Sequence, residues 1–215
     1  FSGGQFNGSS GYEEAASQGL IAGINAARKL QGKEGIVIDR SQGYIGVLID
    51  DLVTKESHEP YRMMTSRAEY RLLLRQDNAD MRLTKIGYEV GLIDEERYQK
   101  LLKKEEMIEK EIERVEHTNV GTTEAVQALL ESYESTPLTS GTTLAELIRR
   151  PELSYEKIAP IDKHREELPY DVKEQVDINI KYDGYIKRQM RQVEQFKKLE
   201  NKRIPENINY DEIQS

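Results

Sequence analysis

The chain has 215 residues, a formal net charge of −8 and no cysteine, and 37% of its residues are hydrophobic against 33% charged. This length suits one large domain or two small ones, and the absence of cysteine excludes disulfides, thiolate metal sites and a cysteine nucleophile. No apolar run approaches the ~20 residues that a membrane-spanning helix needs, and the start lacks the basic region of a signal peptide. Because the first residue is Phe1 and not methionine, we expect a longer natural protein whose N-terminal portion is missing here.

Charge is unevenly distributed along the chain. Residues 61–85 contain six basic and three acidic residues, and residues 181–203 contain eight basic and three acidic residues. The negative total argues against a surface that binds nucleic acid everywhere. The two basic stretches remain candidates for local contacts with phosphate groups.

A Gly-rich stretch opens the chain and continues into a helix of small residues that ends near Leu30. Ser9 or Ser10 can cap this helix, and Glu13 follows Ser10 at capping-box spacing. A Gly-rich turn before a helix N-terminus favours a phosphate, a carbonyl or a developing anion. The simpler interpretation is a tight loop before a buried helix.

The segment over 42–52 is compatible with a helix capped by Ser41 or with a strand, and we favour the helix. A polar loop over 54–60 precedes a row of arginines, Arg62, Arg67, Arg71 and Arg75. If Thr65 or Ser66 caps a helix here, the last three arginines share one face.

This arginine row has two interpretations. It forms either a helix edge paired with Glu69, Asp77 and Asp80, or a phosphate-binding edge. In the second interpretation, Tyr61 and Tyr70 are available to stack on unpaired bases.

The second half of the chain is predicted to be helical. Asp94 caps a helix over 95–117, Thr123 begins one that reaches Tyr133, and Thr143 begins a short helix that ends at Pro151. The last helix is expected over 171–202, with Gly184 as a point of close packing or of ligand approach. Its expected apolar stripe consists of Ile178, Tyr182, Tyr185, Ile186, Met190, Val193 and Phe196. Its basic residues at heptad-like spacing are Lys181, Arg188, Arg191, Lys198 and Lys202, for which phosphate binding and simple solvation are both possible.

No metal site is expected, because His58, His117 and His164 are isolated from one another. The chain also lacks a P-loop. The carboxylates lie mainly on Glu/Lys-rich helix faces, so no catalytic residue is assigned to this chain.

Five segments of the chain resemble the MnmG (GidA) family of flavoproteins that modify the tRNA wobble uridine. They are residues 4–26 (GQFNGSSGYEEAASQGLIAGINA), 40–52 (RSQGYIGVLIDDL), 59–83, 149–155 (RRPELSY) and 175–186 (QVDINIKYDGYI). The resemblance covers nearly the whole chain in order. One departure is Gly3, where the family usually has alanine, and a small residue is kept.

The resemblance implies a mainly α fold, namely the helical C-terminal region of an FAD-binding α/β enzyme with a short remnant of the flavin domain. We expect residues 1–30 to end the flavin domain, residues 31–92 to form a connecting region with the arginine-rich edge, and residues 93–215 to form a helical domain. Without the rest of the flavin domain, residues 1–30 are expected to have no surface to pack on. The isolated chain is therefore expected neither to hold FAD nor to be active.

The family's activity, as the resemblance implies it, is the addition of an aminomethyl or carboxymethylaminomethyl group to carbon 5 of the wobble uridine. The cofactor is FAD, with NADH as reductant and a methylene-folate as one-carbon donor. The partners are tRNA and the GTPase MnmE, and the full-length protein is expected to be a cytoplasmic homodimer.

The resemblance also places site residues. Gln5 matches an FAD-contacting position, and Asn7 and Gly8 lie where they could reach the isoalloxazine ring. Arg62 and Arg71 match positions implicated in tRNA handling. The other expected tRNA contacts are Arg67, Arg75, Lys181, Arg188 and Arg191. The alternative is a docking module for the GTPase that makes no RNA contact.

Overall fold

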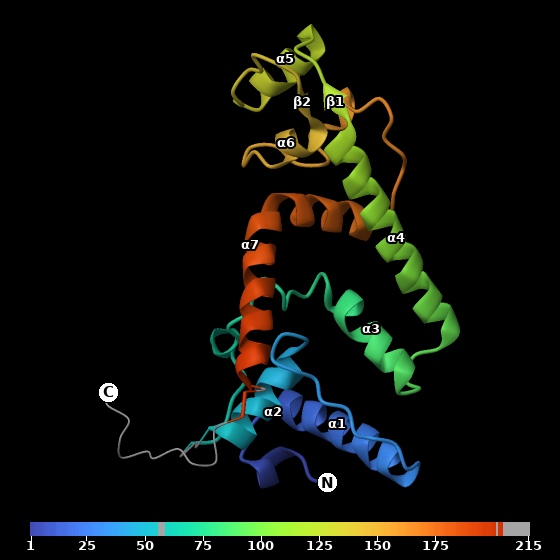
Figure 1. The fold of residues 1–215 in the computed structure, drawn as a ribbon, viewed down its shortest axis with the longest axis vertical. Helices are drawn as coiled ribbons and strands as arrows, with labels where there is room; N and C mark the ends of the chain where they lie inside the picture. The colour runs from blue at the N-terminus through green and yellow to red at the C-terminus, as the bar shows by residue number, and fades with distance from the viewer. Residues whose placement is uncertain (56–58, 201, 204–215) are drawn as a thin grey trace, which may run out of the picture.

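The computed structural model describes residues 1–55, 59–200 and 202–203 (Figure 1). The expectation for His58 lies outside these residues. Within them the protein is mainly α-helical, with one short two-stranded ribbon. In this part of the chain, every helix is too short or too polar to span a lipid bilayer.

Two helices form the N-terminal end of the molecule. A 3₁₀ turn, η1 (Gly4–Asn7), precedes α1 (Tyr12–Leu30), and α1 packs against α2 (Tyr44–Thr54). Ile21, in the middle of α1, is buried, whereas Leu30 at the end of α1 is 91% exposed. The expectation that residues 1–30 lack a packing surface is therefore wrong, because α2 supplies one.

Helix α2 confirms the helical interpretation of residues 42–52, but its cap differs from the expected one. The N-cap is Gly43, and Ser41 does not cap the helix. The reason is local, because the carboxylate of Asp39 accepts hydrogen bonds from both the backbone N–H and the hydroxyl of Ser41.

The arginine-rich segment after Tyr61 does not form the expected helix. Only η2 (Thr65–Arg67), a single 3₁₀ turn, is helical there, and irregular turns follow. In an α-helix the carbonyl of Arg67 would accept a hydrogen bond from the N–H of Arg71. Instead this carbonyl accepts a hydrogen bond from the side chain of Arg40 at 3.2 Å.

The next helices begin at local capping signals. Helix α3 (Ala79–Glu89), which the sequence reading did not identify, leads to α4 (Glu95–His117). The Asp94 carboxylate caps α4 by accepting from the N–H of Arg97 at 2.8 Å. Thr123 and Thr143 likewise cap α5 (Glu124–Ser132) and α6 (Leu144–Ile148). These three predicted caps are confirmed.

Two hydrophobic clusters stabilise the described part of the chain. The larger cluster joins α4, α5, α6 and the start of α7, and it includes Ile108, Leu130, Leu147 and Val176. Strands β1 (Asn119–Val120) and β2 (Thr142–Thr143) pair antiparallel at its edge, and η3 (Ala159–Ile161) contacts α5. The smaller cluster comprises Val47 of α2 with Ala68 and Leu74 of the arginine-rich segment.

Helix α7 (Tyr170–Glu200) extends from the larger cluster toward α2 (Figure 1). Its buried residues are Val172, Gln175, Val176, Ile180 and Val193. The expected apolar stripe is therefore largely wrong, since Tyr182, Tyr185, Met190 and Phe196 are all at least 45% exposed. Only the first part of α7 packs in the core against α4 and α6. The expected close packing at Gly184 is absent too, because nothing lies within 4 Å of the position that a Cβ would occupy.

Candidate functional site

A buried glutamine of α1 holds the Gly-rich loop in place. The Gln18 side-chain carbonyl accepts hydrogen bonds from the N–H of Gly4 (3.2 Å) and the side-chain amide of Asn7 (2.8 Å). Its own amide donates to the hydroxyl of Ser9 at 2.8 Å. Gly4 and Gly8 both have φ of +77°, a conformation that favours glycine. Sequence reasoning missed Gln18, whose signal was a large polar residue within a helix of small residues.

The same loop is joined to the segment that follows α2. The N–H of Tyr61 donates to the carbonyl of Gly8 at 2.7 Å, and the N–H of Ser10 donates to the carbonyl of Tyr61 at 3.1 Å. These two bonds form a short parallel bridge between Ser9 and Tyr61. The Gly-rich loop is thus hydrogen-bonded to the beginning of the arginine-rich segment.

The expected capping box at the start of α1 is wrong. The N-cap residue is Gly11, and no side chain caps it. The hydroxyl of Ser10 donates instead to the carbonyl of Tyr61, so it is turned away from the helix.

Glu14 lies at this helix N-terminus instead. It is 4% exposed, and its Oε1 accepts a hydrogen bond from the N–H of Met63 at 2.7 Å. That bond holds the pKa of the Glu14 carboxyl below its ordinary value. Because a carboxylate already occupies the positive end of α1, this end is poorly suited to the anion that the sequence pattern suggested.

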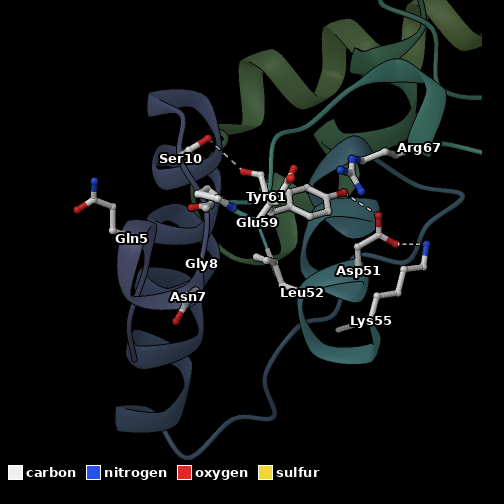
Figure 2. Close-up of a pocket in the computed structure, with 12 residues that line it drawn as sticks. Gln5, Asn7, Gly8, Ser10, Asp51, Leu52, Lys55, Glu59, Tyr61 and Arg67 are labelled. Carbon is white, nitrogen blue, oxygen red and sulfur yellow. Dashed lines mark hydrogen bonds and ion pairs between the residues drawn. The ribbon is translucent and has the colours of Figure 1, made fainter. Parts of the chain in front are cut away.

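A cavity of about 600 Å³ lies between the Gly-rich loop, α2 and the arginine-rich segment (Figure 2). Four of the residues expected to bind a ligand line it, namely Gln5, Asn7, Gly8 and Arg67. Its other walls include Ser10, Asp51, Lys55 and Tyr61. Its volume is in the range of ordinary small-molecule sites. The other expected tRNA-binding residues do not line this cavity.

The loop can accommodate the flavin that the resemblance implies. No described residue lies within 4 Å of the position that a Cβ would occupy on Gly8, which leaves space beside the backbone for a planar ring. Gln5 is exposed at the outer edge of the cavity (Figure 2). The side chain of Asn7 is already bonded to Ser2 and Gln18, so it would mainly shape the loop. In the described part of the chain, no three metal-ligating side chains gather at one place.

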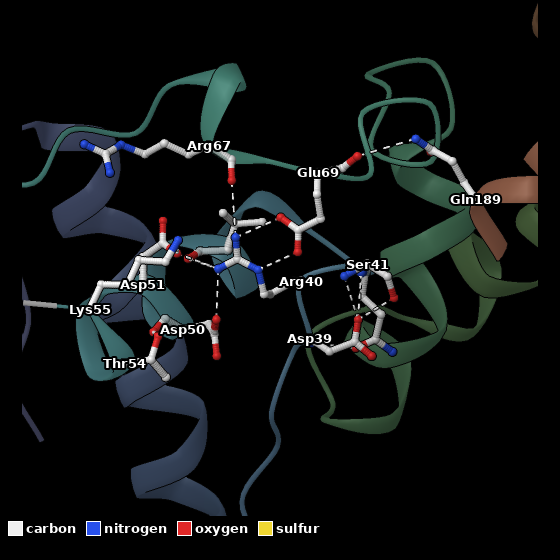
Figure 3. A network of polar contacts seen from close by, with 12 residues as sticks. Asp39, Arg40, Ser41, Asp50, Asp51, Thr54, Lys55, Arg67, Glu69 and Gln189 are labelled. Carbon is white, nitrogen blue, oxygen red and sulfur yellow. Dashed lines mark hydrogen bonds and ion pairs between the residues drawn. The ribbon is translucent and has the colours of Figure 1, made fainter. Parts of the chain in front are cut away.

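Arg40 organises a polar network beside the cavity (Figure 3). Its Nη1 contacts Asp51 at 2.6 Å and Asp50 at 2.9 Å, and its Nε contacts Glu69 at 2.7 Å. Its Nη2 also donates to the carbonyl of Arg67. The Arg40 side chain is 14% exposed and that of Asp51 is fully buried. The network therefore fixes the arginine-rich segment to α2.

Asp51 connects this network to the cavity wall. Its Oδ2 accepts a hydrogen bond from the Tyr61 hydroxyl at 2.7 Å, and its Oδ1 pairs with Lys55 at 2.7 Å (Figure 2). Burial favours the neutral acid, but the bonds from Lys55, Tyr61 and Arg40 outweigh it and lower the pKa of Asp51. Burial and the bond to Asp51 together raise the pKa of Tyr61. The sequence motif over 40–52 contains Arg40 and Asp51 but gives no sign that they meet, and Lys55 and Tyr61 lie outside it.

The predicted tRNA-binding residues divide into two groups. Arg75 pairs with Asp77 at 3.0 Å, and Lys181 pairs with Asp177 at 3.3 Å. The second group is exposed and has no carboxylate partner among the described residues; it consists of Arg62, Arg67, Arg71, Arg188 and Arg191.

The two basic stretches approach each other in space. The side-chain amide of Gln189 on α7 donates to the carbonyl of Glu69 at 3.4 Å. This contact brings the neighbouring Arg188 toward the segment that contains Arg67 and Arg71. Asp80, expected to pair with an arginine, instead contacts Lys104 of α4 at 2.8 Å.

The two tyrosines expected to stack on bases are buried. Tyr61 is 3% exposed and Tyr70 is 7% exposed. The guanidinium of Arg67 lies over the Tyr61 ring at 4.2 Å from its centroid. The expectation that these rings are available to RNA is therefore wrong.

The described residues form a helical domain attached to a Gly-rich segment, and family models of known proteins match both parts. The family model described as "tRNA modifying enzyme MnmG/GidA C-terminal helical domain" matches residues 95–190, and the one described as "Glucose inhibited division protein A" matches residues 1–34.

Individual proteins of this kind are similar to the chain along its length. The tRNA uridine 5-carboxymethylaminomethyl modification enzyme MnmG of Lachnoclostridium phytofermentans is 69% identical over 215 residues, which are 100% of this chain and 34% of that protein. The enzyme of the same name from Caldicellulosiruptor saccharolyticus is 63% identical over 99% of this chain and 34% of its own length. A crystal structure of Aquifex aeolicus GidA matches with a TM-score of 0.81 and 42% identity, covering 99% of this chain and 33% of that one.

The chain belongs to the MnmG/GidA family. It spans about a third of the length of the curated relatives it matches. Its mainly α fold is that of the family's C-terminal helical domain, with a short flavin-domain segment at residues 1–34.

Proposed function

We propose that this chain forms part of an FAD-dependent enzyme that modifies carbon 5 of the wobble uridine of tRNA. Working with the GTPase MnmE, the enzyme adds an aminomethyl or carboxymethylaminomethyl group. The observation that carries this proposal is the 69% identity to a protein named as a tRNA uridine 5-carboxymethylaminomethyl modification enzyme. The complete protein is a cytoplasmic homodimer in this proposal.

The flavin would carry reducing equivalents from NADH, and a methylene-folate would supply the one-carbon unit. In this chain, Gln5 and Gly8 would contact the flavin, while Asn7 keeps the loop in shape. The open space at Gly8 supports this assignment. Residues 1–215 contain no G-x-G-x-x-G run to hold the pyrophosphate of FAD. The chain by itself is therefore expected neither to retain FAD nor to catalyse the reaction.

We assign three roles along the chain. Residues 1–30 belong to the flavin-binding domain, residues 31–92 form the connecting region with the arginine-rich edge, and residues 93–215 form the helical domain for tRNA and partner contacts. The smaller hydrophobic cluster lies within the second of these regions and supports the division.

The tRNA would be bound by the exposed arginines. Arg62, Arg71, Arg188 and Arg191 have guanidinium groups that suit phosphate oxygens, and Arg67 belongs to the same exposed set. Arg75 and Lys181 belong to the proposed set too, but each would have to leave its carboxylate before it could bind phosphate.

A salt series on the complete protein tests the RNA contact. Replacing Arg62 and Arg71 together with Glu should weaken tRNA binding and lower the slope of log Kd against log salt by about one for each lost phosphate contact. Arg97→Glu, at an exposed position of α4, is the control and should leave the tRNA affinity and its salt dependence unchanged.

The second candidate is a docking module for the GTPase without RNA contact. It is favoured by the apolar side chains that α7 exposes, among them Tyr185 and Leu199. If the double variant binds tRNA as the wild type does at every salt concentration, this alternative replaces the RNA-binding edge.

A further inference from the structure

A rigid cation–π pair forms one wall of the cavity beside the Gly-rich loop. The guanidinium carbon of Arg67 lies 4.2 Å from the centroid of the Tyr61 ring. Tyr61 cannot move freely, because its hydroxyl donates to Asp51 and its backbone bridges to Gly8 and Ser10. The ring is therefore a fixed support for the guanidinium.

Arg67 is itself held from two directions. Its Nε donates to the carbonyl of Arg62 at 2.9 Å, and its own carbonyl accepts from Arg40 at 3.2 Å. The first bond restricts the guanidinium, and the second holds the backbone of Arg67, before any ligand arrives. Figure 3 shows the side chain extending away from the Arg40 network, toward the Gly-rich end of the protein.

The charge of Arg67 is not used in an ion pair within the described residues. Arg40, Arg75 and Arg114 each contact at least one carboxylate, whereas Arg67 contacts a carbonyl and a ring. The residue is exposed and lines the cavity of about 600 Å³. The Tyr61 ring lies on one side of the guanidinium, so a ligand in the cavity has to approach it from another side.

We propose that Arg67 is a stacking surface for an unpaired nucleobase of the bound RNA. A guanidinium is planar and stacks on bases, which unpaired RNA segments present to proteins. Tyr61 supports the guanidinium from behind and does not stack on the base itself. This inference rests on the proposed RNA-binding function and adds to it the part of the RNA that enters the cavity.

A double-mutant cycle between protein and RNA tests the stack. The complete protein is prepared as wild type, Arg67→Lys and Arg67→Gln, and each is titrated with an RNA hairpin of the anticodon stem-loop type. Each unpaired loop nucleotide is made abasic in turn. Lys157→Gln is the matched control, because Lys157 also lies over an aromatic ring, Tyr133, at 4.8 Å but outside the cavity.

The stack predicts coupling at one loop position. There, loss of the base and loss of the guanidinium should each weaken binding roughly tenfold, and the two changes together should cost little more than either alone. Arg67→Lys should lose affinity for the intact hairpin as Arg67→Gln does, while keeping the wild-type salt dependence. The control should leave the cycle unchanged.

Two results overturn the inference while leaving the proposed function intact. One is independent, multiplicative losses at every loop position. The other is full rescue by Arg67→Lys, which would indicate a phosphate contact. If the wild-type protein does not bind the hairpin or intact tRNA, the proposed function fails together with this inference. Thermal unfolding of each variant confirms that it is folded.

Discussion

Arg40 joins carboxylates that lie far apart in the sequence but meet in space. Asp50 and Asp51 belong to α2, and Glu69 belongs to the irregular segment that follows it. The guanidinium of Arg40 also donates a hydrogen bond to the carbonyl of Arg67. In an α-helix this carbonyl would accept from the N–H of Arg71. The largely covered side chain of Arg40 thus ties the backbone of the arginine-rich segment to α2.

Replacing Arg40 with Met should destabilise the protein by about 3 kcal/mol, because the buried Asp51 loses one of its partners. The lower end of the usual range applies, since Asp50 and Glu69 keep access to water. Urea unfolding measures the change. Lys100→Met, which removes an exposed ion pair with Glu96, is the control and should cost less than about 0.5 kcal/mol. Equal losses in the two variants would contradict the role given to Arg40.

The same network predicts how stability depends on pH. Arg40 lowers the pKa of Glu69, and for Asp51 the bonds from Lys55, Tyr61 and Arg40 outweigh the opposing effect of burial. Carboxyls with a lowered folded-state pKa stabilise the fold fully above their unfolded pKa of about 4. That stability is lost as the pH falls through the folded-state pKa. The midpoint temperature of thermal unfolding should therefore decrease as the pH is lowered below about 4. This decrease should be less steep in Arg40→Met. Parallel pH profiles for the two proteins would contradict this account.

At the scale of elements, capping residues in the sequence predicted where several helices begin. The caps Asp94, Thr123 and Thr143 each act on an N–H a few residues away, so their helices begin where the sequence indicates. The segment over 66–75 has equally good capping residues but is not α-helical, because Arg40 and the packing of Leu74 on Val47 act across the fold.

The shape of the cavity and the choice of buried residues on α7 also depend on contacts between distant parts of the sequence. Gln5, Asn7 and Gly8 were identifiable from the sequence, but Gln18, Glu14 and Asp51 were not. Their roles come from contacts with Ser9, Met63 and Tyr61 that no periodicity encodes. For α7, the sequence pattern could not reveal that Ile180 is the last residue of the helix in the larger hydrophobic cluster.

Two glycines in helices should respond to alanine in opposite directions. At Gly46 in α2, an added Cβ would lie 2.2 Å from the backbone carbonyl oxygen of Asp39, so Gly46→Ala should destabilise by about 1–3 kcal/mol. At Gly184 in α7 the Cβ would meet nothing within 4 Å, so Gly184→Ala should stabilise by about 0.5–1 kcal/mol. Chemical denaturation of both variants measures this. A stabilised Gly46→Ala would contradict the close contact between α2 and the segment before it.

At the scale of the whole molecule, α7 links the two ends of the structure. Its first part lies in the larger hydrophobic cluster, and its last part contacts Asp39 through Lys197 and Glu69 through Gln189. The exposed Arg188 and Arg191 therefore lie on the helix that contacts the arginine-rich segment. The C-terminal part of α7 reaches α2 (Figure 1), which is one of the elements that line the cavity.

The most direct test of the account is to crosslink the complete protein to its tRNA with ultraviolet light and to map the adducts by mass spectrometry. We predict adducts within residues 60–85 and on α7 beyond Lys181, with one at or beside Arg67. Adducts that lie only outside these two stretches would contradict the assignment of this chain as the RNA-binding part of the enzyme.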